Sequence, residues 1–239
     1  MKTIKNIIEE SLRELKSIDC EYEIQKRNQN RKENQEQESR LIFPKTRGTK
    51  ETGLIRISEQ EARFLFVREL EINKNNHSFY YSIETPTDNI YRFSENGKKI
   101  EPKIGEGQSA SIDVTLYSKE NNGFCRKHLI EFKQGNINTY KKDFLKLLFD
   151  IDGLHNFYIN IIKREDLSKG KTLESIKNKY QNAINDLKKI KRKDNSILTI
   201  ILFNITDGDL RISDNIDLKN NKTKIELCKL QHIKNAKTK

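Results

Sequence analysis

Two neighbouring segments of the chain have the pattern of β-strands, and each carries charged residues. Residues 109–117 alternate between polar and apolar side chains, which is typical of a strand with one face against a core. The turn sequence Asn121-Asn122-Gly123 separates this segment from a second predicted strand, Lys127–Lys133. Because a short turn of this kind joins antiparallel neighbours, we expect the two strands to form a hairpin. The chain must therefore fold around a β-sheet.

The residues before this hairpin predict one helix and two further strands. Ser58 opens the helix with a capping box, and an apolar band follows it at Phe64, Leu65, Val67 and Leu70. Residues 78–84 predict a strand that stops at Pro86, and residues 90–93 predict its hairpin return. The chain therefore has a helix followed by several strands.

The residues after the hairpin alternate between helix and strand. Residues 137–151 carry an apolar stripe at helical spacing, and we expect Lys141, Lys142 and Lys146 to face water. The remaining predicted elements are a strand at 156–162, a basic helix at 172–191 and a buried strand at 197–203. This order predicts an α/β domain with a mixed central sheet flanked by helices.

An N-terminal extension precedes this domain. Apolar residues recur at three- and four-residue steps from Ile4 to Ile18, which predicts an amphipathic helix. Residues 25–40 contain no apolar side chain, so we expect a linker or a solvated helical extension there. We therefore divide the chain into residues 1–50, a helix with a polar linker, and residues 51–239, the main domain.

The basic charge of the chain is concentrated near its C-terminus. The net charge is +11; residues 1–162 hold 27 Lys and Arg against 25 Asp and Glu, and residues 163–239 hold 19 against 10. Such a surplus favours a polyanionic partner, most plausibly nucleic acid, although a Lys-rich composition also arises from a biased genome. We expect four lysines to contact the phosphate backbone of the nucleic acid: Lys188, Lys189, Lys191 and Lys193.

Several other classes of protein do not fit the sequence. Three widely spaced cysteines without a CxxC motif argue against a disulfide framework or a zinc site. The first residues lack the apolar run of a signal peptide, and no apolar stretch is long enough to span a bilayer. No Gly-rich phosphate loop and no metal-binding histidine motif is present. We therefore expect a cytoplasmic protein with no membrane contact.

The charged residues of the two hairpin strands are candidates for chemistry. Glu131 and Lys133 point to the same face of their strand, roughly 6–7 Å apart. If the strands pair, Asp113 meets Glu131 across the ladder, and two carboxylates and an ammonium converge. Two adjacent carboxylates repel each other unless a divalent cation binds, and Mg²⁺ is commonly held by one or two carboxylates. This arrangement indicates metal-assisted phosphodiester hydrolysis.

With these residues and this order of elements, the chain resembles the PD-(D/E)XK phosphodiesterase superfamily, which has the restriction-endonuclease-like fold. The resemblance covers about residues 51–162; it departs from the family pattern where Ile112, rather than Pro, precedes Asp113. It implies a nuclease in which Asp113, Glu131 and the Phe132 carbonyl hold Mg²⁺, for which Mn²⁺ can substitute. It also implies that Lys133 orients or activates the attacking water. Such enzymes commonly act on double-stranded DNA as homodimers.

The resemblance extends to residues with simpler alternative roles. In many members a glutamate on the first helix completes the metal shell, and Glu61 is at the matching position. Glu69, on the same helix, is a second candidate for this role. Glu61 also fits a capping box with Ser58. Gln134 and Tyr140 resemble a pair that contacts substrate in some members, but Tyr140 also fits the apolar stripe of its helix. Ser109 and Ser111 share the face of Asp113, as supporting donors or as plain strand residues.

Two other functions are compatible with the same sequence. One is a nucleic-acid-binding protein that keeps the nuclease fold without cleavage. The other is an interaction module in which the N-terminal helix drives assembly and the lysines only solubilise the chain. The first predicts salt-sensitive binding without metal-dependent cleavage, and the second predicts negligible affinity for polyanions.

Overall fold

The chain divides into two compact units, residues 1–77 and residues 78–239. The structure is a computed structural model, and the predicted linker at 25–40 lies outside the residues that it describes. The described residues are 3–18, 41–43, 57–93, 103–121, 123–135, 140–163, 167, 172–190, 196–220 and 224–230.

The first unit contains two amphipathic helices, α1 (Ile4–Ser17) and α3 (Glu59–Ile72), and a short 3₁₀ helix at Lys74–Asn76. Both predicted helices are confirmed, and an ion pair between Glu14 and Arg68 joins them. The predicted apolar band of α3 is wrong at Phe64, whose side chain is exposed. The helix instead buries Ala62, Leu65, Phe66 and Leu70, one turn apart on a single stripe.

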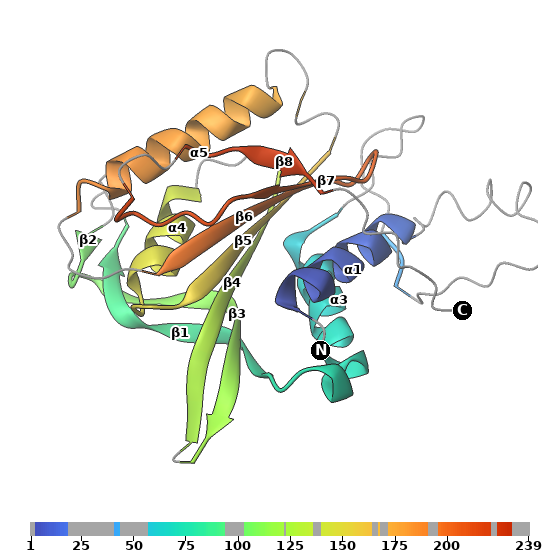
Figure 1. Cartoon of the computed structure of the whole chain (residues 1–239), viewed down its shortest axis with the longest axis horizontal. Coiled ribbons are helices and arrows are strands. Elements are labelled where there is room, and N and C mark those ends of the chain that lie inside the picture. Colours follow the sequence, from blue (N-terminus) through green and yellow to red (C-terminus); the bar gives the residue numbers. More distant parts are fainter. Residues whose placement is uncertain are drawn as a thin grey trace, which may run out of the picture. The chain divides into compact units, whose positions relative to one another are not determined.

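The second unit contains an eight-stranded mixed sheet with the order β2-β1-β3-β4-β5-β6-β7-β8 (Figure 1). Strands β4, β5 and β6 are parallel, and all other neighbours are antiparallel. This confirms the predicted α/β class. The strands are β1 (Tyr80–Arg92), β2 (Lys103–Ile104), β3 (Gln108–Glu120), β4 (Gly123–Gln134), β5 (His155–Ile162), β6 (Ile197–Asn204), β7 (Asp209–Ser213) and β8 (Leu227–Lys229).

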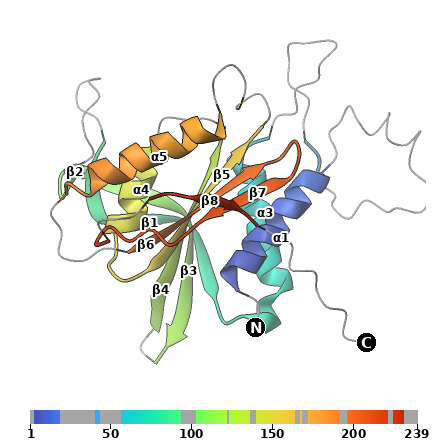
Figure 2. The ribbon, with the colours of Figure 1, turned by 45° about the horizontal axis from the view of Figure 1, so that its top comes forward.

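Two helices, α4 (Tyr140–Phe149) and α5 (Leu173–Leu187), lie on the same face of this sheet (Figures 1 and 2). Each crosses over between parallel strands, as α/β connections require. The core between helices and sheet is formed by Phe144, Leu147, Leu148, Tyr158, Ile176, Tyr180, Ile184, Leu198 and Ile200. Among the helices that the structure describes, none is both long enough and apolar enough to cross a membrane.

Two parts of the sheet differ from the prediction. The segments at 78–84 and 90–93 are not a hairpin but belong to one strand, β1, which passes through Pro86 with a change of register after it. Among the described residues, the part of β1 around Pro86 pairs only with β3, and a proline without an N–H is tolerated on such an unpaired edge. The predicted basic tail also contributes to the sheet, since Leu227–Lys229 pairs with β7.

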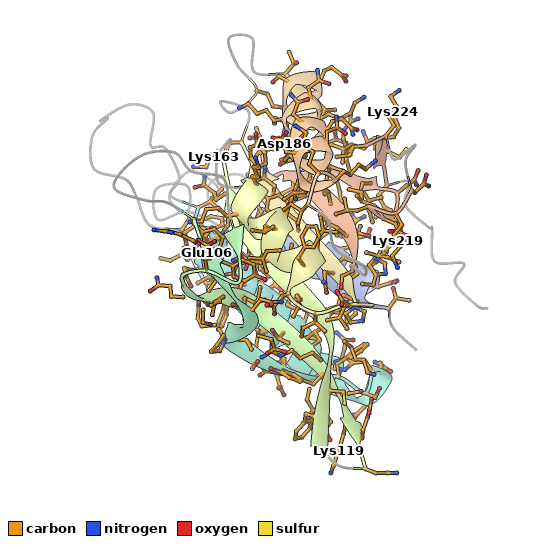
Figure 3. The ribbon with its side chains drawn as sticks, turned by 90° about the vertical axis from the view of Figure 1, so that its left-hand side faces the viewer. Glu106, Lys119, Lys163, Asp186, Lys219 and Lys224 are labelled. Atoms are coloured by element: carbon orange, nitrogen blue, oxygen red, sulfur yellow. The ribbon has the colours of Figure 1, made fainter. Side chains whose placement is uncertain are left out.

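The predicted hairpin of β3 and β4 is confirmed. Glu120 pairs with Gly123 at the turn, and the ladder continues to Val114 and Ile130. The outer part of this hairpin extends away from the rest of the sheet, with Lys119 near its tip (Figure 3). The inner part of the hairpin lies in the centre of the sheet and carries the candidate site.

Candidate functional site

At the inner end of the β3–β4 hairpin, Asp113 and Glu131 lie opposite each other in the two strands. Val114 pairs with Ile130, so the next position of the antiparallel register places Asp113 opposite Glu131. Asp113 Oδ2 accepts a hydrogen bond of 2.7 Å from the backbone N–H of Phe132. This bond fixes the Asp113 carboxylate against β4, beside Glu131.

The same register places Glu131 on the face of the sheet that the helices cover. Glu131 pairs with Tyr158 of β5, and Tyr158 pairs with Ile200 of β6; both partners belong to the core beneath α4 and α5. The side chain of Glu131 is 2% exposed. A carboxylate at this depth needs compensating cations, because an unpaired buried charge is costly.

Burial raises the pKa of Glu131 from 4.5 to about 8. The ammonium groups of Lys146 and Lys133 lower this pKa, whereas the carboxylates of Asp143 and Asp113 raise it further. Desolvation outweighs the attraction of the two lysines, so the pKa of Glu131 lies above its usual range. A cation that binds this carboxylate stabilises its ionised form.

Lys146 is buried, which corrects the prediction that it faces water. Its Nζ lies 2.5 Å from Glu131 Oε1, 3.3 Å from Asp143 Oδ1 and 2.8 Å from the carbonyl oxygen of Ser111. Burial by itself lowers the pKa of Lys146, but the Glu131 and Asp143 carboxylates more than offset this and raise it above its usual range. The stripe pattern of a helix does not reveal such a lysine, because its partner Glu131 lies on a strand.

Asp143 and Lys133 complete a closed arrangement of alternating charges. Lys133 Nζ lies 3.5 Å from Glu131 Oε2 and 4.0 Å from Asp143 Oδ2. We name the four side chains Glu131, Lys133, Asp143 and Lys146 the charge ring. Burial raises the pKa of Asp143 above its usual range, against the attraction of Lys146 and Lys133. With all four groups ionised, the charge ring is neutral.

The donor set of this site fits a hard divalent cation in part. Asp113 and Glu131 offer carboxylate oxygens, and Asp143 Oδ2 is a buried oxygen without a hydrogen-bond partner. Within the described part of the chain, no group of three or more His, Cys, Asp or Glu side chains has the arrangement of a metal site. Asp113 and Glu131 would therefore hold Mg²⁺ together with waters and substrate oxygens, as Mg²⁺ commonly binds.

Glu61 caps helix α3. Its Oε2 accepts hydrogen bonds from the backbone N–H of Ser58, at 2.8 Å, and from the Ser58 hydroxyl, and the capping box is complete. The alternative Glu69 accepts a hydrogen bond of 3.1 Å from Asn73 Nδ2 in the last turn of the helix. Both residues belong to the first unit, and a role for Glu61 as a metal ligand stays a prediction.

The residues that were predicted to contact or support the substrate have different environments in the structure. Gln134 is the last residue of β4, and alternation places it on the face opposite Lys133. Tyr140 opens α4, half-buried, with its ring 5.5 Å from that of Tyr180 and 6.0 Å from that of Phe144, as its place on the apolar stripe indicated. Ser109 donates to carbonyl oxygens of the β1–β3 ladder rather than to Asp113.

The predicted phosphate-binding lysines are only partly described. Lys188 Nζ donates to the carbonyl oxygen of Asn220 at 3.1 Å, and Lys189 Nζ lies 3.0 Å from Asp186 Oδ1. Lys191 and Lys193 lie outside the described residues. Such surface pairs are weak, so they leave Lys188 and Lys189 able to exchange partners for a phosphate.

The sequence patterns missed a strained residue level with Asp113. Glu84 has φ +51°, and the pairs on either side of it, Ile83–Val114 and Thr85–Ile112, place it opposite Asp113. Its carboxylate accepts a hydrogen bond of 2.5 Å from the Ser111 hydroxyl. A left-handed conformation costs about 1–3 kcal/mol for a residue with a side chain and clusters at functional sites. The sequence carries no signal for it, because the residue type Glu does not by itself indicate a positive φ.

The charge ring extends the predicted site by two residues, Asp143 and Lys146. They stand three positions apart on α4, a spacing that indicates at most a local ion pair. Only the packing of α4 against β4 brings this pair onto Glu131. Comparison with known proteins adds no assignment: no family model, curated protein or solved structure matches the chain.

Proposed function

We propose that the protein is a Mg²⁺-dependent nuclease of the restriction-endonuclease-like fold that hydrolyses phosphodiester bonds in double-stranded DNA. The observation that carries the proposal is that Asp113 lies opposite Glu131 in the neighbouring central strand, with Lys133 beside Glu131. Asp113 is fixed by the Phe132 N–H, and Lys133 Nζ lies 3.5 Å from Glu131. Carboxylates with an adjacent ammonium are the residue types that metal-assisted hydrolysis requires.

The order of the elements supports the same proposal. Helix α3 precedes four antiparallel strands, the long strands β1, β3 and β4 and the two-residue β2, and α4 then leads to β5, which is parallel to β4. This is the order that the resemblance to the PD-(D/E)XK superfamily implies. The charged pair lies in the two strands where that resemblance requires it.

Each residue of the site has a distinct role in the proposed reaction. Asp113 and Glu131 would hold the cation, which would supply polarisation of the scissile phosphate and a lowered pKa of a bound water. The Lys133 side chain is 17% exposed, so its ammonium is able to reach a water or phosphate oxygen at the surface of the site. The basic C-terminal third adds phosphate contacts, which position the duplex without reading its sequence.

A cleavage assay tests the proposal. Plasmid DNA, linear DNA and RNA are incubated with the protein in Mg²⁺ or in EDTA, alongside the variant Asp113→Asn. Asp113→Asn keeps an oxygen acceptor for the Phe132 N–H but removes the charge, so it retains the fold and loses cleavage. Cleavage that persists in EDTA, or equal cleavage by Asp113→Asn, would contradict the assignment.

A non-catalytic nucleic-acid-binding protein with the same fold is the second candidate. It is favoured by the two lysines that already neutralise the Glu131 carboxylate, at 2.5 Å and 3.5 Å. Such a protein binds DNA with strong salt dependence but does not cut it in any divalent cation. DNA affinity without cleavage in the same assay would select this candidate.

A further inference from the structure

The charge ring couples the proposed metal ligand Glu131 to two residues of α4 that no sequence motif identified. The ring alternates in sign around its whole length: Lys146 bridges Glu131 and Asp143, and Lys133 bridges the same two carboxylates from the other side. Asp143 therefore competes with Glu131 for both ammonium groups. Changing the charge of Asp143 changes how strongly the lysines hold Glu131.

A purely structural role does not account well for this arrangement. The side chains of Glu131, Asp143 and Lys146 are all less than a tenth exposed. Buried ion pairs of this kind commonly add little net stability compared with apolar residues of similar size. No hydrogen bond from the residues that the structure describes reaches the Oδ2 atom of Asp143, so the ring is not a saturated structural network there.

We propose that Asp143 and Lys146 are positioning residues that balance the charge on Glu131 and Lys133 and thereby set the affinity of the site for a divalent cation. This inference rests on the proposed metal-dependent function. Asp143 keeps the two ammonium groups from being held by Glu131 alone. Lys146 prevents the buried carboxylates from being left uncompensated when no cation is bound.

The net charge of the ring predicts whether a substitution at Asp143 raises or lowers the affinity for a divalent cation. Asp143→Asn removes one negative charge and leaves two ammonium groups facing one carboxylate, so the ring becomes positive. A divalent cation at Asp113 and Glu131 then meets added repulsion, and we expect its affinity to fall on the order of tenfold or more. The double variant Asp143→Asn/Lys146→Met restores neutrality and should recover most of that affinity.

The experiment measures the affinity for Mn²⁺ by electron paramagnetic resonance, on metal-free protein without DNA at mildly alkaline pH. Melting temperatures are recorded for each variant. Asp186→Asn is the matched control: Asp186 on α5 (Figure 3) pairs with Lys141 of α4 at 3.1 Å and with Lys189 at 3.0 Å, outside the ring. The control makes the same change of charge and shape at a more exposed site.

The expected result is weaker Mn²⁺ binding by Asp143→Asn, recovery in the double variant and no change in Asp186→Asn. Equal affinity in wild type and Asp143→Asn would overturn the inference. A double variant that binds as weakly as Asp143→Asn, or more weakly, would also overturn it in favour of a packing role. A wild-type protein that binds no Mn²⁺ and cuts no DNA refutes the proposed function itself, which separates the two failures.

Discussion

Replacing Lys146 by Met tests whether the charge ring is as buried and as tightly paired as the structure shows. Met has nearly the same length as Lys but carries no charge, so the packing of the stem is kept. The variant leaves the Glu131 and Asp143 carboxylates without the ammonium that lies 2.5 Å and 3.3 Å from them. Removing one partner of a buried pair typically costs about 3–5 kcal/mol, because the remaining charge is uncompensated.

The chain offers a closely matched control for this substitution. Lys189 pairs with Asp186 at 3.0 Å with the same three-residue spacing as Lys146 and Asp143, at 3.3 Å. The Lys189 side chain is 77% exposed, whereas that of Lys146 is 9% exposed. Exposed pairs contribute about 0–1 kcal/mol, so Lys189→Met should be nearly neutral. The difference between the two variants reports burial rather than the pairing itself.

Urea unfolding at mildly alkaline pH, where Glu131 is ionised, is followed by circular dichroism and measures the free energy of unfolding of both variants. We expect Lys146→Met to be less stable than Lys189→Met by about 2–4 kcal/mol, with similar m-values. A Lys146→Met protein as stable as the control would refute the reasoning, since the ammonium would then lie in water. A changed m-value in only one variant would point to an altered unfolded state instead.

Three further predictions concern the chemistry. Lys133→Met should lower single-turnover cleavage by about 10²–10⁴ while DNA affinity changes little, since a positioned proton-handling group contributes this much; a normal rate would exclude Lys133. As a metal ligand, Glu61 predicts that Glu61→Gln loses cleavage while its melting temperature barely changes, because Gln also serves in a capping box; full cleavage would leave Glu61 with its capping role alone. At a Mg²⁺ concentration too low to saturate the site, the pH–rate profile should rise through the pKa of about 8 of metal-free Glu131, whose ionised form holds the cation. Between about pH 4.5 and pH 8 the folded state binds one proton more than the unfolded state, so the contribution of Glu131 to the free energy of unfolding of the metal-free protein falls as pH rises. Glu131→Gln should remove this fall. A pH dependence of the unfolding free energy that is the same in Glu131→Gln and in wild type would contradict this.

The sequence by itself determined the elements that local patterns encode. Strict alternation and a turn sequence are enough to place Glu131 and Lys133 on one face and to pair their strand with that of Asp113, because side-chain direction in a strand has a period of two. The capping box at Ser58 and the amphipathic helices were equally readable from spacing. Local backbone rules decide each of these features.

The tertiary structure decided which charged residues are buried. A lysine on an amphipathic helix is normally assigned to water, and only the packing of α4 on β4 turns Lys146 inward to Glu131. A proline normally ends a strand, but β1 continues through Pro86, where no other described strand pairs with its outer edge and needs a hydrogen bond from the proline nitrogen. Both outcomes depend on which surface lies opposite the residue, and that information is spread over segments far apart in the chain.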